Sequence, residues 1–217
     1  VDNIVVYGVD TDISPYDSGS YASSTTYLTG NATIKTCQML REKIIAAGAE
    51  MLEIDIEDAD FDGEKVYSVK EEKSITLKDI ANNVMCYSNH TLTATAKEKT
   101  PVSPPPYMAG AVEIELDKET GHVEIIDYAT CVDCGTVINP ALATVQTEGG
   151  LVQAIGMDLY EDVQYDNKGR TLNDSSTQYK IPTRLDMGKI RVEYESSYEP
   201  SGPFGAKSIG ELVINTP

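Results

Sequence analysis

The chain has 217 residues, enough for one large domain or two small ones with a substantial core. Its formal net charge of -18 argues against nucleic acid as a partner, because binding phosphates takes clusters of Lys and Arg that this chain lacks. No apolar run approaches the roughly 18 residues that a membrane-spanning helix needs, so we expect no membrane partner either.

Residues 1–100 are predicted to form a first α/β subdomain. The apolar run Ile4–Val6 indicates a short buried strand. Apolar residues recur at three- and four-residue steps over residues 34–47, which predicts a helix that ends near Gly48. Alternation of apolar and acidic residues over 52–57 predicts a half-exposed strand, and SITLKDIANNVMCY (residues 74–87) predicts a short helix capped by Thr76.

Residues 101–217 are predicted to form a second subdomain, which begins in the proline-rich stretch TPVSPPPY. Residues 110–130 indicate a hairpin with its turn at DKETG, residues 163–172 a second hairpin, and residues 189–196 a strand. Asn139 and Pro140 suit the start of a long helix. Its apolar side is predicted to comprise Ile138, Leu142, Val145, Val152, Ile155 and Leu159. Helices mixed with antiparallel hairpins predict an α+β (mixed α/β) fold with two subdomains, each with a small sheet and helices.

The cysteines include one CxxC pair, Cys131 and Cys134. Such a pair can bind zinc or carry out redox chemistry, but a zinc site needs about four ligands, and neither a second pair nor matching histidines are present. The pair also ends an apolar run. We therefore favour two packed, reduced thiols over a metal or redox site, and reduced thiols indicate a cytoplasmic protein.

The stretch GSYASSTTYLTG (residues 19–30) concentrates hydroxyl groups where the first long helix begins. One or two hydroxyls would be enough to cap a helix. A larger number suits a phosphate or pyrophosphate group at the positive end of the helix. Both interpretations stay open, although a Walker-type nucleotide site is disfavoured because no lysine follows at the required spacing.

Helical spacing places Gln146, Gly149, Gly150 and Gln153 on one face of the second long helix. Each glycine inside a helix costs roughly 1 kcal/mol relative to alanine, so something approaches the backbone closely there. Either this is tight helix packing, or a ligand lies along the face and accepts hydrogen bonds from the glutamines. The residues alone favour packing.

The stretch EPSGPFGAKSIGE (residues 199–211) has the composition of a constrained loop that ends on Glu211. Its glycines would let main-chain N–H groups approach a ligand. Apolar neighbours, Ile209 and Leu212, would raise the pKa of the Glu211 carboxyl and suit it to act as a general base. The alternative is an ordinary exposed glutamate after a turn.

Four segments together resemble, in order, motifs of the molybdopterin-binding large subunit of the xanthine dehydrogenase and aldehyde oxidase family. They are residues 10–32, 133–162, 179–187 (YKIPTRLDM) and 199–211. The resemblance implies a molybdenum-dependent oxidoreductase that hydroxylates a purine, another N-heteroaromatic ring or an aldehyde. It also implies a molybdopterin cofactor, in its cytosine dinucleotide form in many bacteria, whose metal has no protein side-chain ligand.

The same resemblance implies roles for individual residues. Glu211 would be the catalytic base, taking the proton from the hydroxyl group that attacks the substrate carbon. The cofactor would be held by Ala22, Ser23, Ser24, Thr25, Gln146, Gly205, Ala206 and Lys207. Ser24 stands where many relatives carry arginine. Lys207 ranks last among these cofactor contacts, because its charge could serve the structure alone.

The resemblance covers only the C-terminal cofactor-binding part of that subunit. It implies partners: the remainder of the molybdopterin subunit, and iron–sulfur ([2Fe-2S]) and flavin (FAD) domains or subunits that carry electrons away. We expect the isolated chain to bind little or no cofactor and to be inactive. Two rival hypotheses stay open, a non-catalytic phosphate- or nucleotide-binding module and a scaffold that has kept the fold and lost the chemistry.

Overall fold

The computed structural model describes residues 4–17, 19–88, 91–99 and 102–217. The chain forms two compact units, the first comprising Val1–Asp17 and Thr29–Lys99, the second Ser18–Leu28 and Thr100–Pro217. Each contains one three-stranded sheet with helices, so the α+β class is confirmed. The hydroxyl-rich helix start, which the sequence placed in the first subdomain, lies in the second unit.

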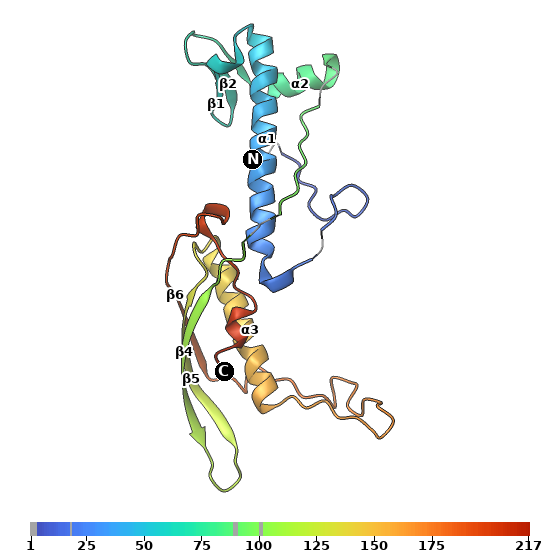
Figure 1. Ribbon diagram of the computed structural model, residues 1–217, viewed down its shortest axis with the longest axis vertical. Helices are drawn as coiled ribbons and strands as arrows, with labels where there is room; N and C mark the ends of the chain where they lie inside the picture. The colour runs from blue at the N-terminus through green and yellow to red at the C-terminus, as the bar shows by residue number, and fades with distance from the viewer. Residues whose placement is uncertain (1–3, 18, 89–90, 100–101) are drawn as a thin grey trace. The chain divides into compact units, whose positions relative to one another are not determined.

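The first unit combines a long helix with a small antiparallel sheet (Figure 1). Helix α1 (Thr25–Leu52) begins in the second unit and enters the first at Thr29. Strands β1 (Ala59–Phe61), β2 (Lys65–Ser68) and β3 (Ser74–Thr76) pair in that order, and helix α2 (Leu77–Tyr87) follows directly. The core that joins helices and sheet consists of Ile44, Val66, Ile80 and Val84.

The predicted cap of α2 is confirmed, since the Thr76 hydroxyl accepts a hydrogen bond from the Asp79 N–H. The predicted end of α1 is wrong. A Cβ on Gly48 would lie 2.6 Å from the Val66 Cβ, so this glycine serves close packing on β2 and the helix continues to Leu52. The expected strand over residues 52–57 is also wrong, because that stretch contains the helix end and the start of a 3-10 turn, Ile56–Asp58.

The expected buried strand at Ile4–Val6 is not formed. These residues have no strand pairing and are exposed, Val6 to 82%. An apolar run predicts burial only if a surface is available to cover it, and the described residues provide none at this point.

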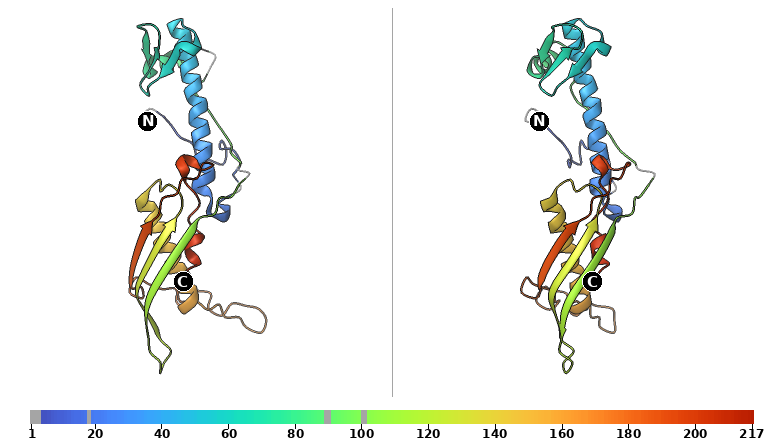
Figure 2. Two further views of the ribbon diagram at one scale, coloured as in Figure 1. Left: turned by 60° about the vertical axis from the view of Figure 1, so that its left-hand side comes forward. Right: turned by 90° about the vertical axis from the view of Figure 1, so that its left-hand side faces the viewer.

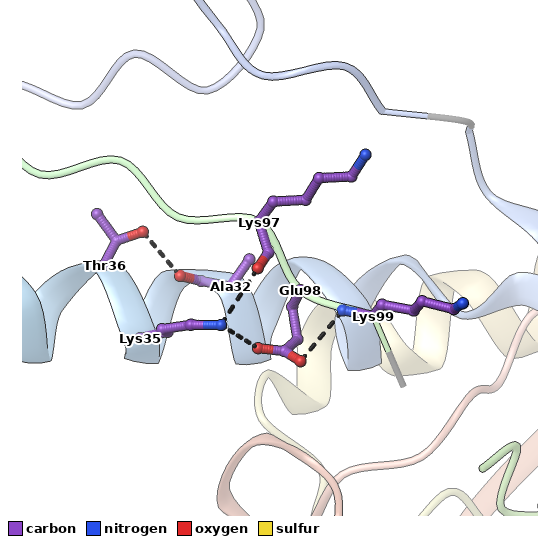
Figure 3. Close-up of polar contacts among 6 residues, drawn as sticks. All are labelled: Ala32, Lys35, Thr36, Lys97, Glu98 and Lys99. Carbon is purple, nitrogen blue, oxygen red and sulfur yellow. Dashed lines mark hydrogen bonds and ion pairs between the residues drawn. The ribbon is translucent and has the colours of Figure 1, made fainter. Parts of the chain in front are cut away.

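Residues 91–99 run along α1 and are attached to it by lysine side chains. Lys43 Nζ donates to the Thr93 carbonyl (2.6 Å). Lys35 Nζ lies 3.4 Å from the Lys97 carbonyl and 3.3 Å from a Glu98 carboxylate oxygen (Figure 3). Both lysines are solvent-exposed. Their contacts hold residues 91–99 against α1 but contribute little to the free energy of unfolding.

The second unit contains a mixed sheet of β4 (Tyr107–Leu116), β5 (Val123–Asp133) and β6 (Lys189–Tyr194). β4 and β5 form the predicted hairpin, and β6 pairs parallel to β5. The parallel pair requires a crossover, and helix α3 (Pro140–Leu159) lies within this connection, on one face of the sheet (Figure 2). The predicted cap of α3 is confirmed, since the Asn139 side chain accepts from the Leu142 N–H.

The core of the second unit lies between α3 and the sheet. It consists of Ile125, Tyr128, Leu151, Ile155 and Met187. The predicted apolar side of α3 is only partly correct: Ile155 is buried and Val152 packs against this core, whereas Leu142 and Val145 are about two-thirds exposed. The second predicted hairpin reduces to an isolated bridge between Tyr165 and Thr171.

Within the described ranges, no helix has both the length and the apolar character that crossing a membrane would require.

Candidate functional site

All the residues predicted to form a site lie in the second unit. They come from three places: the turn before α1, helix α3, and the loop that follows β6. The structure brings parts of all three together around Gly210. A Cβ at this glycine would lie 2.8 Å from the Ser23 hydroxyl and 3.3 Å from the Gln146 amide nitrogen. Glycine therefore permits the close approach, and the neighbouring position in the chain is Glu211.

The turn before α1 has a strained backbone. Ala22 and Ser23 have φ values of 49° and 52°, in the left-handed region that residues other than glycine rarely adopt. Each such residue costs on the order of 1 kcal/mol or more unless its surroundings impose the conformation, and these residues concentrate at functional sites. The strain turns the chain sharply just before the helix and sets Ser23 beside Gly210.

Several hydroxyls of this segment are paired within it. The Ser24 hydroxyl donates to the Tyr21 carbonyl (2.6 Å), and the Ser20 and Thr25 hydroxyls are bonded to each other. These hydrogen bonds shape the turn. The three hydroxyls could bind a ligand only if the bonds were broken first. Ser23 differs because it faces the second and third segments.

The two adjacent glycines of α3 have different environments. A Cβ on Gly150 would lie 2.0 Å from a methyl carbon of Val213, so Gly150 allows tight packing. A Cβ on Gly149 would meet nothing within 4 Å. Gly149, Gln146 and Gln153 share the exposed side of the helix. The packing interpretation is therefore correct for Gly150. At Gly149 the helix backbone is exposed to solvent, on the same side of α3 as the amide side chains of Gln146 and Gln153.

The loop over residues 199–211 is bound to the end of β5 along its backbone. The Thr136 N–H donates to the Gly205 carbonyl (2.8 Å) and the Lys207 N–H donates to the Cys134 carbonyl (2.7 Å). The Gly205 carbonyl also accepts from the Glu199 N–H (3.1 Å), which closes the loop on itself. Gly205 and Ala206 are buried by these contacts, so they form the base of the loop.

Asp133 and Lys207 form an ion pair between β5 and the loop, with 3.1 Å between the Lys207 Nζ and a carboxylate oxygen. The other Asp133 oxygen accepts from the Ser197 hydroxyl (2.6 Å) and the Gly135 N–H (2.9 Å). Burial by itself would raise the pKa of Asp133, but these hydrogen bonds and the lysine outweigh it, and the pKa lies below its usual value. Sequence reasoning missed Asp133, although an acid at the end of a buried strand was a usable signal.

A second contact joins the loop to α1. The hydroxyl of Tyr27, a buried residue in the first turn of α1, donates to the Ser201 hydroxyl (2.6 Å). The Ser201 hydroxyl donates in turn to Glu199 (2.5 Å). Hydrogen bonds from the Ser201 side chain and N–H lower the pKa of the Glu199 carboxyl. Sequence reasoning missed this chain of contacts, which joins residues far apart in sequence.

Glu211 is exposed and begins the 3-10 turn Leu212–Ile214. Its neighbours Ile209 and Leu212 pack instead against the cluster of Val132, Cys134 and Val213. The apolar surroundings expected for this carboxylate are therefore wrong within the described chain: the apolar neighbours turn inward, and Glu211 points outward beside the junction at Gly210.

The CxxC pair is divided between two environments. Cys134 is buried, and its burial raises the pKa of the thiol. Cys131 is exposed, so the expectation of two packed thiols is correct only for Cys134. Over the described ranges, no group of three or more His, Cys, Asp or Glu side chains is arranged to hold a metal ion.

The comparisons with known proteins identify the class of this chain. Residues 1–188 match the family described as "Molybdopterin cofactor-binding domain". The chain therefore belongs to the molybdopterin cofactor-binding domain family. Over 98% of its length it is 34% identical to the "Probable hypoxanthine oxidase XdhD" of Escherichia coli strain K12. Over the same share it is 31% identical to the "6-hydroxypseudooxynicotine dehydrogenase complex subunit gamma" of Paenarthrobacter nicotinovorans.

Solved structures show the same fold. The chain is similar to a Cu,Mo-CO dehydrogenase, with a TM-score of 0.77 and 28% identity over 94% of this chain. It is also similar to the quinoline 2-oxidoreductase of Pseudomonas putida 86, with a TM-score of 0.75 and 26% identity over 93% of this chain. The chain spans only part of these relatives, 22% and 28% of the two curated proteins and 26% and 27% of the two solved chains.

The residues around Gly210 fit a molybdopterin cofactor. The group is large and anionic and needs hydrogen-bond donors and room for close approach more than protein ligands to its metal. The junction offers the exposed Gln146 amide and the half-buried Ser23 hydroxyl, and Gly149 lies about one helical turn from Gln146 on the exposed side of α3. Gln146 and Ser23 would hold the cofactor, whereas Lys207, which was expected among its contacts, directs its side chain to Asp133 instead.

Proposed function

We propose that this chain is the part of a molybdenum hydroxylase large subunit that holds molybdopterin and supplies the catalytic base, Glu211. The convergence of the Ser23 turn, Gln146 and the 199–211 loop at Gly210 carries the proposal. Membership of the molybdopterin cofactor-binding family supports the identity of the ligand. We further propose the cytosine dinucleotide form of the cofactor, a cytoplasmic location, and a subdomain limit near residue 100, with residues 18–28 belonging to the second subdomain.

The proposed reaction is oxidative hydroxylation of a purine, another N-heteroaromatic ring or an aldehyde. When bound, the molybdenum centre supplies the two-electron acceptor and the place where water is activated. This chain's own contribution is the Glu211 carboxylate, which would accept a proton at one of its oxygens as the substrate carbon is attacked. Partners follow from the chemistry: electrons would leave through [2Fe-2S] and FAD groups on other domains or subunits, and the remainder of the molybdopterin subunit would complete the pocket.

The test uses the full-length parent subunit expressed with its partners, beside a Glu211→Gln variant. The measurements are molybdenum bound per subunit and hydroxylation of hypoxanthine, nicotinate and benzaldehyde. We expect unchanged molybdenum and a fall in turnover of about 10²- to 10⁴-fold, the usual contribution of a general base. Glu195→Gln removes an exposed carboxylate outside the junction and serves as the matched control, with no change expected.

Two results would contradict the proposal in different ways. If Glu211→Gln keeps full turnover, the assignment of the base is wrong. If the wild-type protein binds no molybdenum, the likeness is one of fold alone. The hydroxyl-rich helix start would then favour a non-catalytic phosphate- or nucleotide-binding module.

A further inference from the structure

Asp133 and Lys207 form a partly buried charge pair that has no role in the proposed reaction. The Lys207 side chain is 9% exposed and that of Asp133 is 19% exposed. The ammonium group also lies 5.6 Å from the centre of the Tyr107 ring. Lys207 is thus enclosed by a carboxylate and an aromatic ring, and its side chain points toward the end of β5. Its ammonium group therefore interacts with Asp133 and Tyr107 rather than with solvent.

The backbone and the side chain of Lys207 attach to the same place. The N–H bonds to the Cys134 carbonyl at 2.7 Å, and the Nζ bonds to Asp133 at 3.1 Å. Asp133 is held in turn by Ser197 and by the Gly135 N–H. Removing either charge would leave the other partly shielded from water without its ionic partner, which is unfavourable. The loop is therefore anchored to β5 four residues before Glu211.

Only three residues separate Lys207 from Glu211 in the chain. Ile209 packs into the cluster with Val132 and Cys134, and Gly210 fits against Ser23 and Gln146. Glu211 itself is exposed and its side chain makes no capping hydrogen bond to the turn that it begins. The position of Glu211 thus depends on the backbone of the loop, which is held by the anchor at Lys207 together with the packing of Ile209 and Gly210.

We infer that Asp133 is a positioning residue that acts through Lys207: their ion pair fixes the 207–211 backbone and thereby aims the Glu211 carboxylate. The inference rests on the proposed role of Glu211 as base. Misplacing a reacting group by about 1 Å can cost roughly 100-fold in rate. Loosening the anchor should therefore affect turnover more than binding.

The experiment uses the full-length holoenzyme with Asp133→Asn, which removes the charge and keeps the shape. Turnover is measured with whichever of hypoxanthine, nicotinate and benzaldehyde the enzyme accepts, and is expressed per bound molybdenum. We expect kcat to fall about 10- to 100-fold with KM and molybdenum content nearly unchanged. Lys207→Met should behave in the same way, and Lys207→Arg, which can keep the ion pair, should retain most of kcat.

Amide hydrogen exchange provides a readout independent of activity. In Asp133→Asn the Lys207 and Thr136 amides should exchange about 10-fold faster or more, because the loop opens locally. Asp127→Asn is the matched control. Asp127 lies on β5, like Asp133, and its ion pair with Arg191 of β6 (2.9 Å) is lost in this variant. Neither kcat nor the exchange rates of the Lys207 and Thr136 amides should change.

The outcomes separate this inference from the proposed function. If Glu211→Gln abolishes turnover while Asp133→Asn and Lys207→Met keep full kcat per molybdenum, the positioning role is wrong and the base assignment stands. A loss of thermal stability with unchanged kcat per molybdenum would also overturn it, since that is the result of a purely structural pair. If Asp133→Asn does not accumulate, Lys207→Met carries the same test from the other partner.

Discussion

The two units of this chain differ in how far along the sequence their contacts reach. In the first unit, β1, β2, β3 and α2 follow one another within residues 59–87 and pack on the nearby helix α1. In the second, the turn at residues 22–25, the end of β5, helix α3 and the 199–211 loop come from widely separated places. The predicted site residues all lie in the second unit. A site that must surround a ligand needs groups from several directions, and non-local packing supplies them.

Matched core truncations would test this contrast most strongly. Leu151 in the second unit and Ile80 in the first are both fully buried. Leu151→Ala and Ile80→Ala should each destabilise their own unit by about 2–5 kcal/mol. Only Leu151→Ala should lower the molybdenum content of the full-length protein, because α3 carries Gln146. Thermal unfolding and metal analysis of both variants check this, and equal loss of molybdenum from the two would remove the distinction between the units.

The adjacent glycines of α3 offer a sharper pair of substitutions. Gly150→Ala places a methyl group against Val213 and should destabilise the protein by roughly 1–3 kcal/mol. Gly149→Ala meets open space and should stabilise the helix by about 0.5–1 kcal/mol. Denaturant unfolding of both variants measures the difference. Equal effects of the two substitutions would show that α3 is not tightly packed on Val213 at Gly150.

The same Gly149→Ala variant tests the open face. If the cofactor approaches the backbone at Gly149, the added methyl group should lower molybdenum content in the full-length protein even as the fold gains stability. Unchanged content would place the cofactor away from this side of α3.

The smallest effect is expected at the link between α1 and the loop. Tyr27→Phe removes the hydrogen bond to Ser201 and should cost about 1 kcal/mol of stability. Tyr21→Phe, at a side chain that is 70% exposed, is the control and should change stability very little. Thermal unfolding of the two variants distinguishes them, and a neutral Tyr27→Phe would mean that the loop is held from the β5 side alone.

Local signals in the sequence predicted the elements that depend on local chemistry. The caps at Thr76 and Asn139, the β4–β5 hairpin and the strand at residues 189–194 are all formed. The failures occur where another part of the chain decides the outcome. Gly48 does not end α1 because Val66 packs against it, and Leu142 stays exposed because α3 presents another face to the sheet.

The sequence by itself determined the class of fold, the helix caps and the residue types that suit a molybdopterin site, because these depend on short-range propensities and on motifs whose order is preserved along the chain. Only the tertiary structure decided which of those residues meet. It set Ser23 and Gln146 against Gly210, left Glu211 exposed and joined Asp133 to Lys207. Such pairings link positions up to about 190 residues apart, and their geometry is set by packing and loop closure, which no local pattern in the chain encodes.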